Sequence, residues 1–169
     1  GAAPINWAVI NGDKTTGVTT FMIDDGMDTG GIMFREQCRI EPDENVGQVH
    51  DKLMGIGSEL VVQTVEAIIE GNIELRVQKS FIQGSEILRP APKITRELCH
   101  IDWSGKTKEI YNLIRGLSPY PAAFTELVKE DKTLQMKIFN SLKVTGEDFA
   151  AMLERCNLTS AKPGTILSD

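Results

Sequence analysis

A run of apolar residues at three- and four-residue steps between residues 46 and 68 constrains the fold of this chain more than any other feature. This spacing places the residues on one face of an α-helix, and another element must cover that face. Asp43 or Asn45 can cap the start of the helix, and Gly71 can end it. Gly55 and Gly57 lie inside it, where each glycine costs about 1 kcal/mol relative to alanine. The apolar positions are Val46, Val49, Leu53, Ile56, Leu60, Val61, Val65 and Ile68.

Three shorter elements are predicted before this helix. Residues 4–11 favour a helix, because Pro4 suits a first turn and Gly12 can follow the last one. Residues 18–23 (VTTFMI) are β-branched and apolar on both faces, which predicts a strand inside a covered sheet. Residues 32–40 alternate between apolar and polar side chains, which predicts a half-exposed strand. Strands followed by a long helix indicate an α/β protein.

The pattern changes near residue 92, which predicts two structural units. We therefore divide the chain into residues 1–71, a linker over residues 72–92, and a second unit over residues 93–169. The elements predicted after the long helix are, in chain order, a short strand at 75–81, a helix at 106–115 ended by the sequence SPYP, strands at 124–128 and 134–139 joined by a charged turn at 129–133, a short helix around 149–153, and a turn at 162–164 that enters a strand.

The composition is that of a globular protein, with 41% hydrophobic and 25% charged residues among 169. No apolar run approaches the roughly 18 residues that a membrane-spanning helix needs, so no membrane partner is expected. Three scattered cysteines and two histidines argue against a disulfide framework and a zinc site, and favour the reducing cytoplasm. Residues 1–92 carry 7 basic and 14 acidic side chains, whereas residues 93–169 carry 11 and 10. The second unit is therefore the more basic one.

The loop at residues 24–31 (DDGMDTGG) is the candidate site, because it places three carboxylates and three glycines directly after a predicted strand. Strand ends with a flexible backbone often bind ligands in α/β proteins, although Asp and Gly can also merely build a turn. The tripeptide DTG also occurs in aspartic proteases, but there two carboxylates share one proton. This chain contains DTG only once, which argues against an aspartic protease. An EF-hand is excluded as well, because the third and twelfth positions counted from Asp24 are Gly26 and Arg35. No metal site is predicted.

Residues 1–33, 101–127 and 162–166 together resemble segments of the methionyl-tRNA formyltransferase family. Residues 1–33 (GAAPINWAVINGDKTTGVTTFMIDDGMDTGGIM) are similar to the second half of its catalytic domain. Residues 101–127 (IDWSGKTKEIYNLIRGLSPYPAAFTEL) and 162–166 (KPGTI) are similar to its C-terminal domain, and the order is the same. The resemblance implies the fold class: the C-terminal half of a Rossmann-like formyltransferase domain, then a linker, then a partial OB-like β-barrel domain.

That family transfers a formyl group from 10-formyltetrahydrofolate to the α-amine of methionine on initiator tRNA. The resemblance thus implies a cytoplasmic enzyme of translation initiation, with folate and methionyl-tRNA as its partners. Attack on the formyl carbon creates an oxyanion, and the amine must lose a proton, so the reaction needs an oxyanion donor and a proton relay. By similarity, Asp28 is the catalytic aspartate, and Ile23, Asp24, Asp25 and Gly26 contact the pteridine of the folate.

The catalytic asparagine and histidine of the family lie in an Asn-x-His segment just before the Gly-Ala-Ala-Pro stretch, and these 169 residues do not include it. Neither His50 nor His100 falls at the corresponding place in the order of the family. We therefore expect the chain to be part of a longer enzyme and to be inactive by itself. Two alternatives stay open, namely a formyltransferase acting on an amino sugar or nucleotide, and a non-enzymatic RNA-binding fragment.

Overall fold

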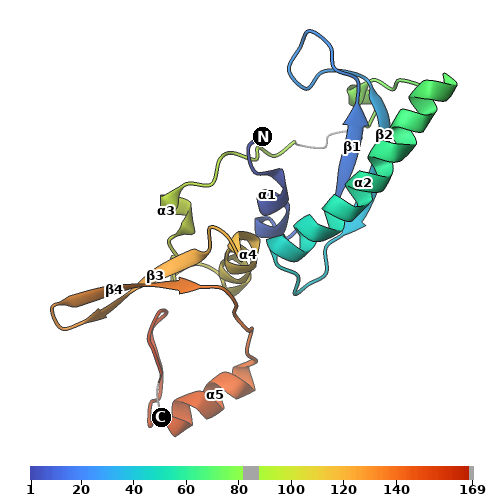
Figure 1. Cartoon of the computed structure of the whole chain (residues 1–169). Coiled ribbons are helices and arrows are strands. Elements are labelled where there is room, and N and C mark those ends of the chain that lie inside the picture. Colours follow the sequence, from blue (N-terminus) through green and yellow to red (C-terminus); the bar gives the residue numbers. More distant parts are fainter. Residues whose placement is uncertain (82–87, 168–169) are drawn as a thin grey trace.

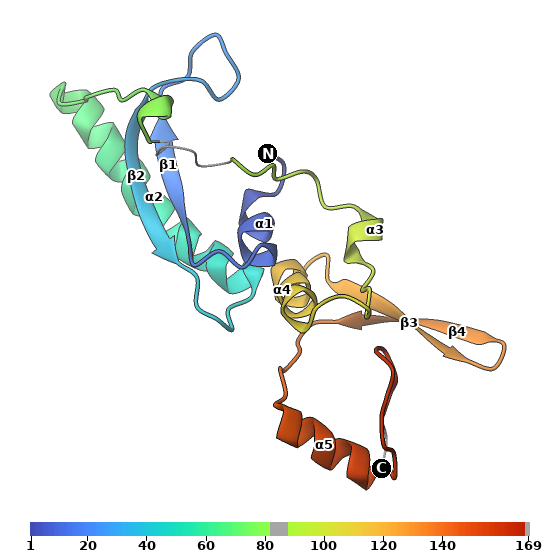
Figure 2. The ribbon, with the colours of Figure 1, turned by 180° about the vertical axis from the view of Figure 1, so that it is seen from behind.

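A computed structural model describes residues 1–81 and 88–167. The elements form two groups, which meet where helix α1 (Pro4–Ile10) packs against helix α4 (Thr107–Leu117) (Figures 1 and 2). Helix α1 covers the residues predicted for it, with Pro4 in its first turn and Gly12 in the left-handed conformation just after its end. Among the described residues, no helix has both the length and the apolar character needed to cross a membrane.

The first group combines helix α1 with an antiparallel pair of strands and the long helix. Strands β1 (Thr15–Phe21) and β2 (Ile32–Arg39) pair along their whole length, from Thr15 opposite Arg39 to Phe21 opposite Ile32. Helix α2 (Val46–Glu70) lies along one face of this pair (Figure 1). Strand β2 and helix α2 therefore lie where the periodicity predicts them, and β1 overlaps the strand predicted at residues 18–23.

The ends of α2 carry the capping residues that the sequence indicates. The Asn45 side chain accepts a hydrogen bond from the backbone N–H of Gln48 at 3.0 Å, and the Gln48 side chain accepts one from the backbone N–H of Asn45 at 2.9 Å. This reciprocal pair satisfies two backbone donors that the first turn of a helix leaves free. At the other end Gly71 adopts φ = 71°, a left-handed conformation in which glycine carries no steric penalty.

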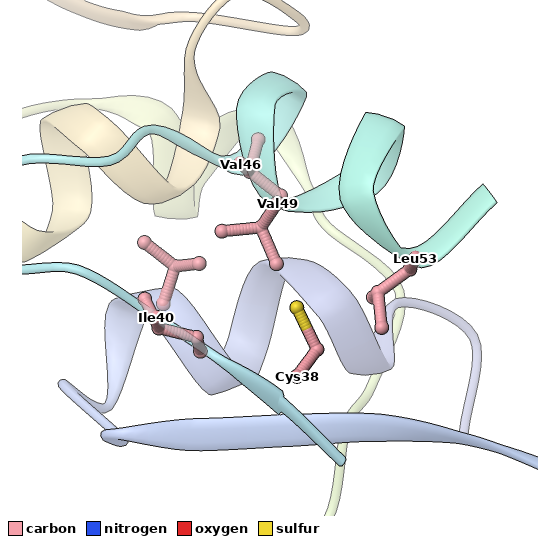
Figure 3. Packing of buried hydrophobic residues seen from close by; sticks show 6 residues of the cluster. Cys38, Ile40, Val46, Val49 and Leu53 are labelled. Atoms are coloured by element: carbon pink, nitrogen blue, oxygen red, sulfur yellow. The ribbon is translucent and has the colours of Figure 1, made fainter. Parts of the chain in front are cut away.

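The core of the first group lies under the N-terminal half of α2. Val46, Val49 and Leu53 of α2 pack in one cluster with Cys38 of β2 and with Ile40, which directly follows that strand (Figure 3). The remaining member of this core is the fully buried Val9 of α1. The C-terminal half of α2 differs, because several of its apolar residues are at least half exposed. These are Val61, Val62, Ile68 and Ile69.

The prediction of a strand covered on both faces is wrong for residues 18–23. Side chains of β1 alternate between exposed and half-buried, because α2 packs against only one face of the β1–β2 pair within the described residues. The strand also begins earlier than predicted and ends at Phe21. Met22 and Ile23 follow it, and Ile23 is 88% exposed.

The second group consists of α4, the short helix α3 (Arg96–Cys99), a hairpin and helix α5 (Gly146–Arg155). Strands β3 (Ala123–Lys129) and β4 (Lys132–Ile138) pair through a two-residue turn, shorter than the predicted one, and form a two-stranded sheet. The described residues contain no closed barrel, so the partial OB-like barrel is not confirmed. The core residues of this group are Cys99, Ile101, Ile114, Leu117, Ala123 and Phe124.

The connector after α2 does not form the strand predicted at residues 75–81. Arg76 makes a single β-bridge with Ile32, and the chain then turns into a 3₁₀-helix, η1 (Gln78–Phe81). This turn places the Phe81 ring 5.0 Å from the guanidinium of Arg35 on β2. A side-chain contact with β2 thus replaces the continued strand pairing. The strand predicted after residue 164 is absent up to Leu167, and its last two residues lie outside the described ranges.

The α1–α4 joint is built around a buried arginine. Arg115 of α4 donates to the backbone carbonyl of Val9 at 3.4 Å and to that of Glu44 at 2.9 Å. Tyr111, one turn earlier, donates from its hydroxyl to the carboxylate of Asp43 at 2.7 Å. Burial lowers the pKa of Arg115, whereas the nearby acidic groups and Tyr111 act in the opposite direction. The joint therefore ties α4 to both α1 and the segment before α2.

The ion pair between Glu44 and Lys52, beside this joint, makes the stability of the fold depend on pH. Glu44 accepts hydrogen bonds from Lys52 Nζ at 2.8 Å and from the backbone N–H of Glu41 at 2.8 Å. Burial by itself raises the pKa of the Glu44 carboxyl, but these two donors outweigh it and hold the pKa below the usual value of 4.5. A carboxyl with a lowered folded-state pKa adds stability above its unfolded pKa, and this stability is lost as the pH falls through the folded value.

We therefore expect Lys52→Met to lower the free energy of unfolding by about 0.5–1 kcal/mol at pH 7, because the pair is partly exposed. The difference from wild type should shrink as the pH drops below 4.5, where Glu44 becomes protonated in both proteins. Urea unfolding between pH 3 and pH 7 (roughly the range over which a carboxyl titrates) measures this. A difference that stays constant over the whole range would contradict the assignment to Glu44.

Candidate functional site

The candidate loop, residues 24–31, connects β1 to β2 at the end of an antiparallel hairpin, and in both ribbon views it extends away from the packed elements (Figures 1 and 2). Its base is closed by a hydrogen bond from the backbone N–H of Met22 to the carbonyl of Gly31 at 2.9 Å. Residues Asp24 to Thr29 are exposed. The structure thus places all three carboxylates of the loop together at an accessible edge.

The carboxylate of Asp24 shapes the loop from within. Its Oδ1 atom accepts a hydrogen bond from the backbone N–H of Gly26 at 3.1 Å and another from the hydroxyl of Thr29 at 2.6 Å. This is the local bonding by which Asp stabilises turns. For Asp24 the Oδ1 atom therefore builds the turn, which gives this side chain a structural role in the loop.

Two glycines are required by close approaches inside the loop. A Cβ at Gly30 would lie 1.5 Å from the carbonyl oxygen of Met22, and a Cβ at Gly26 would lie 2.1 Å from the Thr29 hydroxyl. The first clash is with backbone and cannot be relieved by rotating a side chain. Gly30 is also buried, so the loop folds back tightly onto the end of β1.

Asp28 adopts φ = 57°, in the left-handed region that few residues other than glycine, Asn and Asp occupy. The side-chain amide of Gln78 donates to the backbone carbonyl of Asp28 at 2.7 Å and to that of Gly30 at 2.9 Å. Gln78 thus holds Asp28 by its main chain and not by its carboxylate. Asp28 is exposed at the tip, where its carboxylate can reach a ligand.

The remaining predicted contacts, Ile23 and Asp25, lie on the same loop and its entry. Ile23 is 88% exposed and Met27 is 91% exposed, so two apolar side chains flank the acidic ones in water. Such exposed apolar groups are available to a flat, partly apolar ligand. The predicted folate contacts and the predicted catalytic residue therefore lie within one short exposed segment. These residues are Ile23, Asp24, Asp25, Gly26 and Asp28.

The two histidines lie on other elements and show no catalytic arrangement. His50, in the second turn of α2, contacts the Asp51 carboxylate at 3.3 Å and is exposed. His100 follows α3, and its ring centroid lies 5.2 Å from that of Phe124. Among the described residues, no cluster of His, Cys, Asp and Glu side chains is arranged to hold a metal ion.

Sequence reasoning missed Gln78 as a contributor to this loop. It lies 50 residues beyond Asp28, in a stretch without periodicity, and nothing in its neighbourhood indicates a polar anchor. The sequence offers only an indirect indication. Backbone carbonyls of the loop that face the protein need hydrogen-bond donors, and a polar side chain from another segment can provide them.

Two family models match the chain. The model described as formyl transferase matches residues 1–65, and the model described as formyl transferase, C-terminal domain, matches residues 93–169. The chain belongs to the formyl transferase family. The match to the first model precedes the match to the C-terminal domain, which is the order that the resemblance implies.

Curated relatives with high similarity carry the name methionyl-tRNA formyltransferase. One from Phocaeicola vulgatus is 53% identical over 85% of this chain and 45% of its own length. One from Azobacteroides pseudotrichonymphae is 47% identical over 100% of this chain and 49% of its own length, and one from Bacteroides fragilis is 46% identical over the same shares. The chain thus spans about half the length of the curated relatives it matches.

Solved structures with a similar fold share little sequence with the chain. HypX from Aquifex aeolicus, in complex with tetrahydrofolic acid, gives a TM-score of 0.60 at 18% identity and covers 74% of this chain and 21% of its own. A sugar N-formyltransferase from a Shewanella species gives 0.60 at 17% identity, covering 83% and 56%. At this identity the likeness shows the fold alone.

Proposed function

We propose that the protein takes part in transferring a formyl group from 10-formyltetrahydrofolate to the α-amine of methionine on initiator tRNA. The observation that carries this proposal is the 46–53% identity to relatives named methionyl-tRNA formyltransferase, over 85–100% of the chain. The protein is then a one-carbon transferase of translation initiation, active in the cytoplasm. The chain supplies the second half of its catalytic domain and part of its C-terminal domain.

The geometry of the loop supports a folate contact made mainly by backbone groups. Pteridine presents a flat edge of hydrogen-bond donors and acceptors, and Gly26 has no side chain to keep such an edge away. The Asp24 Oδ1 atom is engaged by the backbone N–H of Gly26 and the hydroxyl of Thr29, which gives this carboxylate a role in the turn and favours the main chain as the part that meets the ligand. Ile23, Asp24, Asp25 and Gly26 form the proposed folate-binding segment. The neighbour HypX, whose structure holds tetrahydrofolic acid, shares this fold.

Asp28 is the proposed catalytic residue of this chain. The amine attacks the formyl carbon, the new carbon–nitrogen bond forms, and the bond from that carbon to N10 of the folate breaks. One proton leaves the amine, and one proton reaches N10. In this scheme Asp28 orients the histidine of the Asn-x-His segment and assists the proton transfer, while the asparagine of that segment faces the oxyanion. The exposed position of Asp28 beside the folate-binding segment suits this role.

The proposed domain division follows the same reasoning. Residues 1–71 belong to a Rossmann-like formyltransferase domain, residues 72–92 link it to the next unit, and residues 93–169 belong to an OB-like C-terminal domain. The two family matches, at residues 1–65 and 93–169, support such a division.

The experiment compares the 169-residue chain with a full-length enzyme in which the Asn-x-His segment precedes it. We expect no formylation of methionyl-tRNA by the chain alone and rapid formylation by the full-length enzyme. Assays with an amino-sugar nucleotide as acceptor test the alternative substrate, which the fold of the Shewanella sugar N-formyltransferase makes reasonable. A full-length enzyme that formylates the sugar nucleotide and not methionyl-tRNA would contradict the proposal.

A further inference from the structure

The connector that follows α2 returns to the candidate loop, and its contacts are specific. Arg76 exchanges two backbone hydrogen bonds with Ile32 at the start of β2, at 2.8 and 2.9 Å. Phe81 then packs against Arg35 on the same strand. These two contacts, on either side of Gln78, fix the short helix η1 against β2. Gln78 is therefore held in place before it reaches the loop.

Gln78 binds loop residues that do not take part in the hydrogen bonds of the Asp24 side chain. Within the loop, Asp24 ties itself to Gly26 and Thr29. The carbonyls of Asp28 and Gly30 instead both accept hydrogen bonds from the same nitrogen of Gln78. One side chain thus bridges the two residues around Thr29, including the left-handed Asp28.

We propose that Gln78 is a positioning residue for the active site: it holds the candidate loop in the conformation that presents Asp28 and the folate-binding segment. The inference rests on the proposed function for its catalytic part. The physical reason is that a left-handed aspartate in an exposed loop is locally unfavourable, and an external anchor makes that conformation the dominant one. Losing the anchor lets the loop sample other conformations, in which Asp28 points elsewhere.

The test uses Gln78→Met, which keeps the length of the side chain and removes its N–H donors, and Gln78→Glu, which keeps the shape and faces the two carbonyls with oxygens. Gln63→Met, on the exposed face of α2, is the matched control. Backbone ¹⁵N order parameters of the 169-residue chain report on the loop directly. For residues 28–30 we expect values near 0.8 in wild type and in the control, and below about 0.6 in both Gln78 variants.

Steady-state kinetics of the full-length enzyme form the second arm. We expect Gln78→Met to reduce kcat/KM for 10-formyltetrahydrofolate at least about ten-fold, through both a higher KM and a lower kcat, with the thermal midpoint close to that of Gln63→Met. Unchanged order parameters, or kinetics equal to those of the control, would overturn the proposal. A wild-type enzyme that formylates no acceptor would overturn the proposed function instead, and the order parameters would then decide the role of Gln78 alone.

Discussion

Asp28→Asn in the full-length enzyme is expected to lower kcat by at least about 10²-fold, the lower end of the effect of a positioned acid–base group. Asparagine keeps the size of aspartate and tolerates the left-handed backbone at this position, where φ is 57°. The substitution removes the charge and the ability to accept a proton. Binding of folate and tRNA should change little, because the lost interaction belongs to the transition state.

The matched controls are Asp24→Asn and Asp25→Asn. The first of these keeps a side-chain oxygen that can accept the hydrogen bonds from Gly26 and Thr29, so the turn should persist with a small loss of stability. Measurements of kcat, KM and melting temperature for the three variants separate catalysis from turn formation. Similar, small effects at all three positions would show that the carboxylates only build the loop.

Arg115→Met is expected to lower the free energy of unfolding by about 2–4 kcal/mol, the largest stability effect of a single substitution that we predict. The Glu44 carbonyl and the Asn112 side-chain oxygen would each lose a donor inside the joint, and each buried, unsatisfied acceptor costs about 1–3 kcal/mol. The Val9 carbonyl would keep its hydrogen bond from the backbone N–H of Gly12. Arg155→Met, on the exposed end of α5, removes the same charge where no such joint exists and should change stability by about 0.5 kcal/mol or less.

Urea unfolding followed by tryptophan fluorescence measures this effect, since Trp7 lies in α1 and Trp103 lies near α4. In wild type we expect one cooperative transition, because the joint couples the two groups. In Arg115→Met the weakened joint should let the groups unfold at different urea concentrations, which gives two transitions or a lower m-value. Identical unfolding curves for Arg115→Met and Arg155→Met would contradict the role of the joint.

The parts of the fold that the sequence predicts well are those fixed by neighbouring residues. Helix α2 has its cap at Asn45, its end at Gly71 and its apolar face between them, and all these signals lie within one segment. The hairpin β3–β4 likewise follows from two short strand-like segments joined by a charged turn. The candidate loop is recognisable because carboxylates and glycines are concentrated in eight residues.

The parts that the sequence does not predict depend on partners far away in the chain. A run such as VTTFMI favours a doubly covered strand, but the number of faces covered depends on what packs there, and α2 covers one. The segment at residues 75–81 has strand-like residues, yet the contact of Phe81 with Arg35 turns it into η1. Gln78 contacts a residue 48 positions away in the sequence, and Arg115 contacts one 106 positions away. No local sequence pattern predicts contacts over such separations.

The packing of α1 against α4 has a consequence for the order of events on the ribosome. Asn6 donates to the carbonyl of Gly116, 110 residues later, so α1 emerges from the exit tunnel long before its partner exists. At about 5–20 residues per second, translation takes roughly 5–20 s to produce that partner. The β1–β2 hairpin and α2 can form during this interval, whereas α1 keeps its α4-facing side open to water or to a chaperone. The packing of α1 is therefore completed only after the β1–β2 hairpin, α2 and α4 have all been synthesised.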